Sequence, residues 1–243
     1  MSQELKGKTV LVTGGAHRVG RLICLSAARE GADIILHHFS SNAVAAETAE
    51  ELSRLGVSVW LYSYDLSKAN GIVAFIDTVW SEKPFDILVN SAAIFGDHRF
   101  EDTSLVDWER HLAVNLTAPF LLSKTFAAKL QEGQHGRIVN ILDWRALRPG
   151  SDHFPYTISK AALAAMTRSL AISLAPRITV NGLALGAILP PADGAEVGSI
   201  TKNIPSGRWA KESELGDAIL FLLTGPEYIT GEILHLDGGR HLV

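Results

Sequence analysis

Residues 8–30, KTVLVTGGAHRVGRLICLSAARE, decide the fold. The stretch is short and apolar up to residue 13, rich in glycine over the next seven residues, and periodic at helical spacing after that. A strand, a tight turn and a helix in this order bring free backbone N–H groups and the positive end of a helix dipole to one point, where they attract a pyrophosphate. We therefore predict a nucleotide-binding turn; a purely structural glycine turn is the alternative. The residues expected to line it are Gly14, His17, Arg18, Val19 and Gly20.

The rest of the chain repeats this alternation. Further strand-like runs cover residues 32–38, 57–65, 84–93, 137–142, 178–185 and 231–239. Helical patterns lie between them at residues 42–55, 67–80, 105–130, 156–174 and 215–223. Strands that alternate with helices predict a parallel sheet with right-handed crossovers and helices on both faces. We expect an α/β fold, a single-domain Rossmann-type doubly wound parallel sheet of about seven strands over residues 1–243, with ligands at the carboxyl ends of its strands.

Composition limits the class of partner. The 243 residues are 47% hydrophobic with a net charge of −4, and no basic stripe is visible, so we expect a small-molecule partner rather than nucleic acid or an anionic membrane. No apolar run approaches the roughly 20 residues that span a bilayer, and the first residues lack a signal-peptide core. A cytoplasmic protein is therefore expected. The single cysteine, Cys24, fits a core thiol in a reducing compartment, and no metal site is expected.

A second informative stretch is RIVNILDWRALRPGSDHFPYTISK, residues 137–160, which predicts a buried strand, a loop and the start of a helix. Tyr156 and Lys160 are four residues apart, so both side chains project from one face of that helix. A tyrosine has a pKa of ~10, and a neighbouring ammonium lowers it toward the working range of an acid–base catalyst. Asp143, at the end of the strand, is expected to face the same point. The alternative is an ordinary amphipathic helix with both side chains at its surface.

The end of the second strand bears on the choice of cofactor. Sites that prefer NAD place an acid about 20 residues after the glycines, where it holds the ribose hydroxyls. Here the strand ends in LHHFSS, residues 36–41, without a carboxylate. His37, Ser40 and Ser41, with Arg18 from the glycine turn, can donate hydrogen bonds to a 2′-phosphate, so we predict NADP(H). In the alternative interpretation the serines cap the next helix and the histidines line a strand end.

With these motifs the chain resembles the short-chain dehydrogenase/reductase family from end to end. The features that carry the resemblance are the glycine turn, Asp65 after the third strand, Asn90-Ser91-Ala92-Ala93 after the fourth, Asn115 within a helix, Tyr156 with Lys160, and a closing LDGG. The resemblance implies hydride transfer with a nicotinamide. In that reaction Tyr156 is the acid or base, Lys160 binds the nicotinamide ribose and lowers the tyrosine pKa, and Asn115 holds a proton-relay water.

The same resemblance implies the remaining cofactor contacts. Asp65, followed by Leu66, is expected to bond the adenine. The segment expected to line the adenosine and ribose is Asn90, Ser91 and Ala92, and two further contacts are expected from Gly186 and Ile188 after the sixth strand. A homo-oligomer, a tetramer or a dimer, is also implied by the resemblance.

Within the family, the chain is similar in its motifs to the pteridine reductases. It shares their HRVG-type turn with Arg18, their histidine and serine after the second strand, an aspartate (Asp143) in place of the usual serine, and a phenylalanine at Phe95. The similarity implies that Phe95 and the nicotinamide sandwich a pterin while Asp143 bonds its aminopyrimidine edge. An ionised carboxylate only accepts hydrogen bonds, so it suits an N–H-rich heterocycle better than a developing oxyanion. Ala93 and Leu185-Gly186 depart from that pattern.

Residues 187–210 are the longest tract without clear periodicity and follow a strand end beside the proposed site. Long irregular loops in compact domains are often lids, so we predict a substrate-covering lid here. Trp209, near its end, is expected to close on the substrate; the alternative is a tryptophan used for packing.

Three functions remain open from the sequence. The first is an NADPH-dependent reductase of a pteridine- or dihydrofolate-like ring. The second is a carbonyl reductase of ketones or ketoacyl thioesters that tolerates Asp143. The third is a nucleotide-binding regulatory protein that kept the fold without the chemistry, against which the intact Asn115, Tyr156 and Lys160 argue.

Three of the candidate site residues also have structural alternatives. Asn115 can be a hydrogen-bonded amide of the core, and Phe95 can be a core aromatic. Asp143 can be the ion-pair partner of Arg145 or Arg148.

Overall fold

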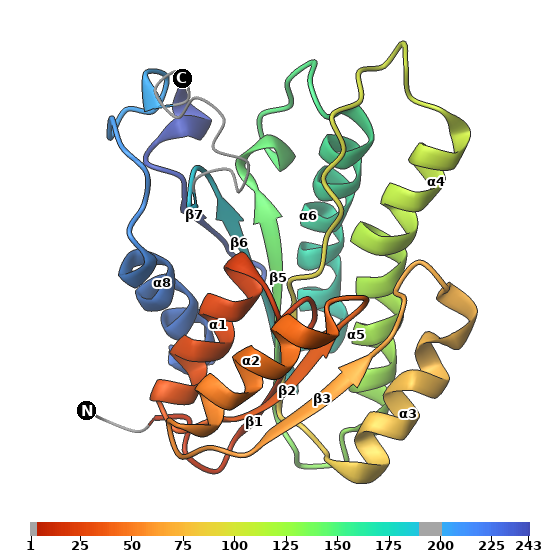
Figure 1. The fold of residues 1–243 in the computed structure, drawn as a ribbon, viewed down its shortest axis with the longest axis vertical. Coiled ribbons are helices and arrows are strands. Elements are labelled where there is room, and N and C mark those ends of the chain that lie inside the picture. Colours follow the sequence, from red (N-terminus) through yellow and green to blue (C-terminus); the bar gives the residue numbers. More distant parts are fainter. Residues whose placement is uncertain (1–3, 190–200) are drawn as a thin grey trace.

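A computed structural model describes residues 4–189 and 201–243, and its centre is a parallel sheet (Figure 1). The strands are β1 (Thr9–Val12), β2 (Asp33–His38), β3 (Val59–Ser63), β4 (Ile87–Asn90), β5 (Gly136–Asp143), β6 (Ile178–Leu185) and β7 (Ile233–Leu236). They form one seven-stranded sheet in the order β3-β2-β1-β4-β5-β6-β7, in which every neighbouring pair is parallel. The Rossmann-type α/β fold expected from the sequence is confirmed.

Helices cover both faces of this sheet, as Figure 1 shows. On one face lie α1 (Arg18–Arg29), α2 (Asn42–Ser53) and α8 (Glu212–Thr224), and on the other lie α3 (Ile72–Glu82), α5 (Ala118–Lys129) and α6 (Phe154–Leu174). Alternate residues of a strand point to opposite faces, so Val10 and Val12 pack with the first layer while Leu11 packs with the second. Because both faces of the sheet are covered, all four residues of β1 are buried rather than alternate ones.

The order of the strands fixes where a ligand can bind. β1 has β2 on one side and β4 on the other. After β1 the chain runs across the sheet to β2 and β3, and then crosses back to β4 on the opposite side of β1. In open parallel sheets such a switch point opens a crevice at the carboxyl ends of the strands. The glycine turn after β1 and the segment after β4 therefore meet at this edge.

The structure refines several predicted boundaries. The helix predicted over residues 105–130 is α4 (Leu105–Leu112), a π-helical turn (Ala113–Thr117) and α5 in succession. The helix predicted over residues 67–80 begins with a 3₁₀ turn (Ala69–Gly71) before α3. None of the helices in residues 4–189 and 201–243 combines the length and apolar character that a bilayer crossing requires. The central part of the predicted lid, residues 190–200, lies outside the described residues.

Candidate functional site

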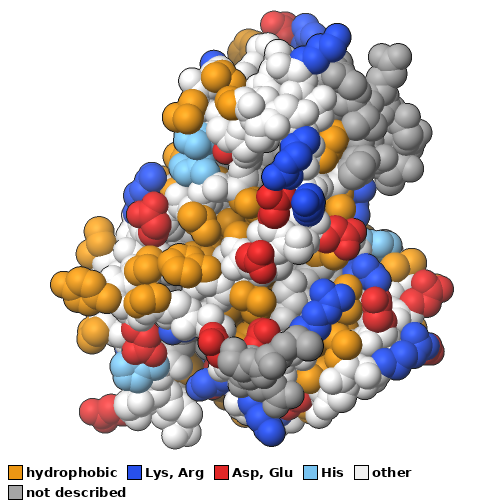
Figure 2. Space-filling view, turned by 90° about the vertical axis from the view of Figure 1, so that its left-hand side faces the viewer, with side chains coloured by type: hydrophobic (Ala, Val, Ile, Leu, Met, Phe, Trp, Pro, Cys, Tyr) orange, Lys and Arg blue, Asp and Glu red, His pale blue; other side chains and the backbone are white. Residues whose placement is uncertain are grey.

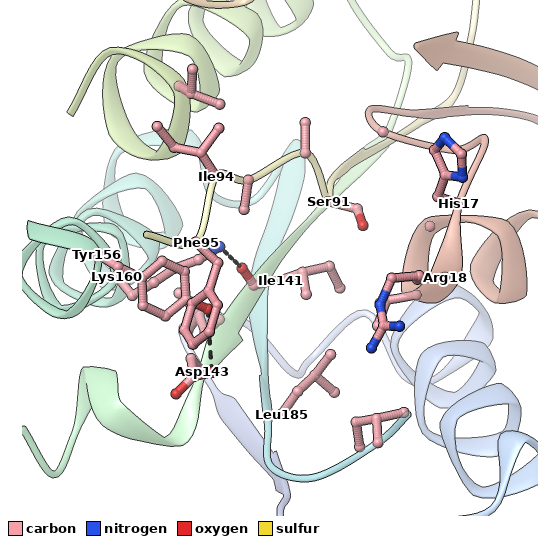
Figure 3. A pocket seen from close by; sticks show the side chains of 18 of the residues that line it. His17, Arg18, Ser91, Ile94, Phe95, Ile141, Asp143, Tyr156, Lys160 and Leu185 are labelled. Carbon is pink, nitrogen blue, oxygen red and sulfur yellow. Dashed lines mark hydrogen bonds between the residues drawn. The ribbon is translucent and has the colours of Figure 1, made fainter. Parts of the chain in front are cut away.

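A cavity of about 1160 Å³ runs along the carboxyl edge of the sheet, at the switch point (Figure 3). Of the predicted site residues, all except Asn90 and Asn115 line it in the described part of the chain. Figure 3 shows two groups facing one another across the cavity: His17 and Arg18 from the glycine turn on one side, and Phe95, Tyr156 and Lys160 on the other. The cavity thus joins the glycine turn to the end of β5.

The glycine turn is shaped for a close approach by a ligand. Gly14 has a φ of 67°, which suits glycine, and Arg18 has a φ of 45° although it carries a side chain. A Cβ added to Gly20 would overlap the carbonyl oxygen of Gly14. His17 at the N-cap of α1 makes no side-chain capping bond, so the first N–H groups of the helix face the cavity without a cap. This cradle fits the pyrophosphate of a dinucleotide.

His37 holds this turn in place rather than offering a ring nitrogen to a ligand. Its Nδ1 accepts a hydrogen bond from the N–H of Gly14 at 3.2 Å, and its Nε2 lies 3.0 Å from the carbonyl oxygen of Tyr64. These two partners assign the proton to Nε2. Burial lowers the pKa of His37 to about 4; the Tyr64 bond opposes this shift and nearby His38 adds to it. The ring is therefore neutral at neutral pH.

The residues beyond the end of β2 are arranged differently. Ser41 occupies the N-cap position of α2 without a side-chain capping bond, so the capping role considered for it is not realised. Ser40 and Ser41 line the cavity together with Arg18, whose guanidinium donates to the carbonyl oxygen of Leu189 at 3.2 Å. His38 also lines the cavity, and its buried Nδ1 has no hydrogen-bond partner among the described residues. These side chains place several hydrogen-bond donors beside the glycine turn.

Asp65 lies after β3 at the same edge. One of its carboxylate oxygens accepts hydrogen bonds from both the N–H and the hydroxyl of Ser67, at 3.0 and 2.7 Å. Burial raises the pKa of this carboxyl, but the two Ser67 bonds and the nearby charges of Lys68 and Arg110 outweigh it, so the pKa lies below its ordinary value. Asp65 is an ionised acceptor in the cavity wall, and Leu66 lines the wall beside it.

At the other end of the cavity, Tyr156 and Asp143 form a pair. The phenol of Tyr156 donates to a carboxylate oxygen of Asp143 at 3.2 Å, and both side chains line the cavity (Figure 3). Burial raises the pKa of Tyr156 well above its ordinary value, and the charge and hydrogen bond of Asp143 raise it further, while Arg145 lowers it. The lowered tyrosine pKa expected from the sequence is wrong for this structure, because the phenol is buried and because a carboxylate rather than an ammonium contacts it.

Lys160 is buried one turn further along α6, with 2% of its surface exposed. Its ammonium donates to the carbonyl oxygen of Ile141 at 2.7 Å, and Nζ lies 5.8 Å from the centre of the Tyr156 ring. Burial lowers the pKa of Lys160 to about 8, and the charge of Asp143 opposes that shift. The ammonium is thus fixed to β5 beneath the phenol while the side chain reaches the cavity.

Asn115 lies in the π-helical turn and is fully buried. Its amide oxygen accepts from the N–H of Ile94 at 2.9 Å, and its amide nitrogen donates to the carbonyl of Ile94 and the hydroxyl of Ser159, at 3.1 and 3.0 Å. The side chain therefore joins the segment after β4 to α6. A relay role for Asn115 remains a prediction.

Asn90 has a similar position beneath the site. It donates to the amide oxygen of Asn140 at 2.8 Å, and Asn140 donates in turn to the hydroxyl of Thr167. Its neighbours Ser91 and Ala92 face the cavity, and their N–H groups donate to the hydroxyl of Thr13. The predicted segment is thus at the site, with its asparagine pointing into a polar network inside the protein.

Phe95 forms an aromatic platform with 57% of its surface exposed, so it is not a core residue. His153 stacks on it with ring centres 4.0 Å apart, and Tyr156 meets it edge-on at 4.7 Å. His153 adopts a φ of 50° directly before α6, and its Nδ1 lies 2.9 Å from the carbonyl oxygen of Gly96. This strained residue braces the platform from one side.

The ion pair considered for Asp143 exists in a weak form. Arg145 lies 3.7 Å from an Asp143 oxygen but contacts Asp152 at 2.7 Å, and its backbone N–H donates to Asp143 at 2.9 Å. Asp143 therefore bonds to Tyr156 and to the start of the next turn, and still lines the cavity. Arg148 instead donates to the carbonyl oxygen of Arg240.

The last predicted contacts follow β6. Gly186 packs against the chain near its end, because an added Cβ would lie 2.6 Å from the Cα of Asp237. Ile188 is buried in the cavity wall. Trp209 also lines the cavity, and its buried indole N–H has no acceptor among the described residues.

Sequence reasoning did not identify several residues that line or brace the site. These are His38, Trp144, Asp152, His153 and Arg240. The loop after β5 was predicted to lie at the site, so the position of Trp144 and Asp152 on this loop could have identified them. Nothing in the sequence connects Arg240 with β5, because they are almost a hundred residues apart.

Known proteins are similar to this chain over nearly its full length. The family model described as enoyl-(acyl carrier protein) reductase matches residues 14–241. The 3-oxoacyl-[acyl-carrier-protein] reductase FabG of Aquifex aeolicus is 34% identical, over 98% of this chain and 99% of that protein. The 2-dehydro-3-deoxy-D-gluconate 5-dehydrogenase of Bacillus subtilis is also 34% identical, over 97% of this chain and 95% of the relative.

A solved structure of similar likeness is FolM alternative dihydrofolate reductase 1 from Brucella canis, complexed with NADP. It superposes with a TM-score of 0.90 at 32% identity, covering 99% of this chain and 96% of that chain. Since the family model and these relatives extend over nearly the full length, the chain belongs to the short-chain dehydrogenase/reductase family of oxidoreductases.

Proposed function

We propose that this protein is an NADP(H)-dependent reductase of a pteridine- or dihydrofolate-like ring. The observation that carries the proposal is the carboxylate of Asp143 in the cavity wall, 3.2 Å from the phenol of Tyr156. Asp143 accepts hydrogen bonds from the N–H groups of an aminopyrimidine, whereas it repels the oxyanion that develops on a reduced ketone. The likeness to the Brucella FolM protein supports the same substrate class.

The residues present fit NADP(H). The cradle at Gly14 and Gly20 would hold the pyrophosphate, and Asp65 would accept from the adenine. Arg18, Ser40 and Ser41 would surround a 2′-phosphate, since they line one end of the cavity and no carboxylate follows β2 there. The NADP bound to the Brucella protein supports this preference.

The chemistry follows from the substrate end of the cavity. Bound NADPH supplies the hydride. Tyr156 keeps its proton at neutral pH and would be the proton donor for reduction, although its raised pKa makes it a weaker acid than an ordinary phenol. A ring nitrogen that takes the Tyr156 proton and a ring N–H that bonds to Asp143 together would orient the substrate. Lys160, fixed by Ile141, would hold the cofactor ribose beneath the phenol.

Phe95 would support the flat face of such a ring. One side of the phenyl is covered by His153, and its large exposed fraction leaves surface for a second ring to stack on. Stacking of this kind contributes on the order of 1 kcal/mol beyond the buried area. The indole N–H of Trp209 would be a further donor to a bound ligand.

A carbonyl reductase is the second candidate. The FabG and gluconate dehydrogenase relatives, which act on oxo or hydroxy substrates by name, favour it. In this case Tyr156 would donate its proton to the carbonyl oxygen, and Asp143 would have to move away from the developing charge.

Steady-state oxidation of NADPH and NADH against dihydrobiopterin, dihydrofolate and a panel of ketones distinguishes the two. We expect turnover of the pteridines with NADPH, and we expect Asp143→Ser to abolish that turnover. Under the carbonyl-reductase alternative, Asp143→Ser preserves or improves ketone reduction. Tyr156→Phe is the control that removes the proton donor and must abolish either activity. Turnover of ketones alone, or a preference for NADH, would contradict the proposal.

We also propose that the chain forms a homo-oligomer. Large apolar side chains are exposed on the outer helices, including Leu105 and Val106 on α4 and Ile172 on α6. Figure 2, which views the side of the molecule that carries α8, shows hydrophobic side chains gathered toward one edge, with acidic and basic ones interspersed elsewhere. A subunit interface would cover such surfaces. A lid over residues 187–210 remains a proposal from the sequence.

A further inference from the structure

The C-terminal turn after β7 brings an arginine to the substrate end of the cavity. The closing LDGG of the sequence builds this turn: Gly238 and Gly239 have φ angles of 63° and 85°, which suit glycine. The buried carboxylate of Asp237 accepts from the N–H of Gly239 at 2.9 Å, and from the N–H and Nδ1 of His241 at 2.8 and 2.7 Å. Arg240 is therefore held between two residues that bond to the same carboxylate.

The turn is also fixed to the rest of the site. Gly186, after β6, packs directly on Asp237, and the N–H of Ser206 donates to the carbonyl oxygen of Gly238 at 3.0 Å. Arg148, in the loop after β5, donates to the carbonyl oxygen of Arg240 at 3.4 Å. Three separate segments thus determine where the Arg240 side chain begins.

The guanidinium of Arg240 lies against Trp144, the residue that follows Asp143. Its central carbon is 4.2 Å from the centre of an indole ring, and the central carbon of Arg145 is 4.8 Å from it. Two cations therefore contact one aromatic side chain beside the proposed substrate ring. Contacts of this kind hold a cation over the face of the ring and leave its N–H groups available for hydrogen bonds.

The two arginines differ in how their charge is balanced. Arg145 bonds to Asp152 and lies near Asp143. The guanidinium of Arg240 makes no hydrogen bond or ion pair among the described residues, although it is partly buried and lines the cavity. Burial and the charge of Arg145 lower the pKa of Arg240, while Asp143, Asp152 and Asp237 oppose this. An arginine remains charged under such a shift, so the cavity wall holds a cation that bonds to no carboxylate among the described residues.

We propose that Arg240 binds a carboxylate carried by the substrate, so that the natural substrate is an anion with its reducible ring at Asp143 and its acid group at the C-terminal turn. The inference rests on the proposed reductase activity and narrows its substrate class. A planar guanidinium takes a carboxylate in a bidentate arrangement, and the Trp144 platform keeps it oriented. The acidic side chain of a dihydrofolate-like molecule meets this requirement, and an uncharged pterin does not.

The test is a binding titration by calorimetry of NADP-loaded protein with folate and with its glutamate diester, which has the same ring without the negative charges. We expect wild type to prefer folate and Arg240→Gln to weaken folate binding by roughly 10- to 100-fold while leaving the diester unchanged. Arg240→Lys should recover part of the preference, since it keeps the charge but not the fork. Arg54→Gln, which removes one positive charge from the end of α2 and lies outside the cavity, is the matched control.

Equal binding of folate and its diester by wild type would overturn the role of Arg240 while leaving the pteridine proposal intact. So would an equal loss for both ligands, or a matching loss of NADP affinity, in Arg240→Gln. If wild type binds neither ligand, the pteridine proposal fails instead. The same arginine is then tested with a keto acid, levulinate, and its methyl ester as substrates. In that assay Arg240→Gln must raise KM for the acid and leave KM for the ester unchanged.

Discussion

The two ends of the cavity are lined by different kinds of chemical group. At the cofactor end, the cradle proposed for the pyrophosphate is formed by backbone groups: the glycine turn and the uncapped start of α1, braced by a neutral His37. At the substrate end, charged side chains dominate, with Asp143, Arg145 and Arg240 around one tryptophan. We infer from this difference that the main chain would hold the pyrophosphate, which is the part of the ligands common to the family. Side chains would then distinguish the substrate of this particular member.

The strongest test of this contrast is Gly20→Ala. The added methyl would overlap the carbonyl oxygen of Gly14, and backbone atoms cannot move aside as a flexible side chain can. We expect the Kd for NADPH to rise roughly 1000-fold, about 4 kcal/mol, measured by fluorescence titration. Gly216→Ala is the matched control in another helix, because there the methyl meets only the hydroxyl of Ser26 at 3.0 Å. Wild-type affinity in Gly20→Ala would show that the main chain is not the recognition element.

A second test concerns the neutral histidine that supports the turn. The pKa of His37 is lowered from 6.5 to about 4, so between these values the unfolded chain binds a proton that the folded protein does not. Its contribution to stability is complete above pH 6.5 and is lost as the pH falls toward 4, by about 3 kcal/mol in total. Urea unfolding at several pH values across this window measures the loss.

In His37→Gln this part of the pH dependence should disappear, because glutamine does not titrate. His135→Gln, in an exposed loop, is the control and should retain the slope. An unchanged acid slope in His37→Gln would mean that the turn does not depend on a neutral ring.

A third test concerns the buried Lys160 at the substrate end of the cavity. Burial lowers the pKa of Lys160 to about 8, so holding an ammonium there destabilises the folded protein at neutral pH. We expect Lys160→Met to raise the free energy of unfolding of the cofactor-free protein at pH 7 by about 1–2 kcal/mol while abolishing activity.

The stability gain of Lys160→Met should shrink between pH 8 and 10.5. In that range the folded wild type has released the proton that the unfolded chain still holds. The penalty is therefore full below pH 8 and fades as the pH rises toward 10.5, so the stability of wild type rises across this window. Lys124→Met, at an exposed position, is the control. A loss of stability at pH 7 would mean that the bond to Ile141 outweighs the cost of burial.

The sequence predicted the cofactor end better than the substrate end for a physical reason. The glycine turn is local, because the strand, the turn and the helix follow one another within residues 8–30. Phe95, Asp143 and Tyr156 were identified as candidates, since each follows or begins a recognisable element. Their mutual geometry depends on packing between elements, and this is why the predicted direction of the Tyr156 pKa shift was wrong.

Other features depended on contacts that no pattern encodes. His37 was expected to face a phosphate. Its two ring nitrogens instead bond to the N–H of Gly14 and the carbonyl oxygen of Tyr64, and only the folded structure brings these groups to the ring. The π-helical turn at Asn115 has no distinct periodicity in a helix predicted over residues 105–130. Arg240 approaches Trp144 only because β6 and β7 bring the end of the chain beside β5.

The hydrogen bond between Tyr156 and Asp143 has a consequence for discrimination among substrates. Any molecule that engages the phenol must first separate it from the carboxylate, which then needs a new donor. A ring with an acceptor and an N–H side by side satisfies both groups at once. A simple ketone satisfies only the phenol and leaves one oxygen of the partly buried carboxylate without a donor, an omission that costs on the order of 1 kcal/mol. Selectivity of this kind comes from a hydrogen bond that the wrong substrate breaks and does not replace, and it requires no steric barrier.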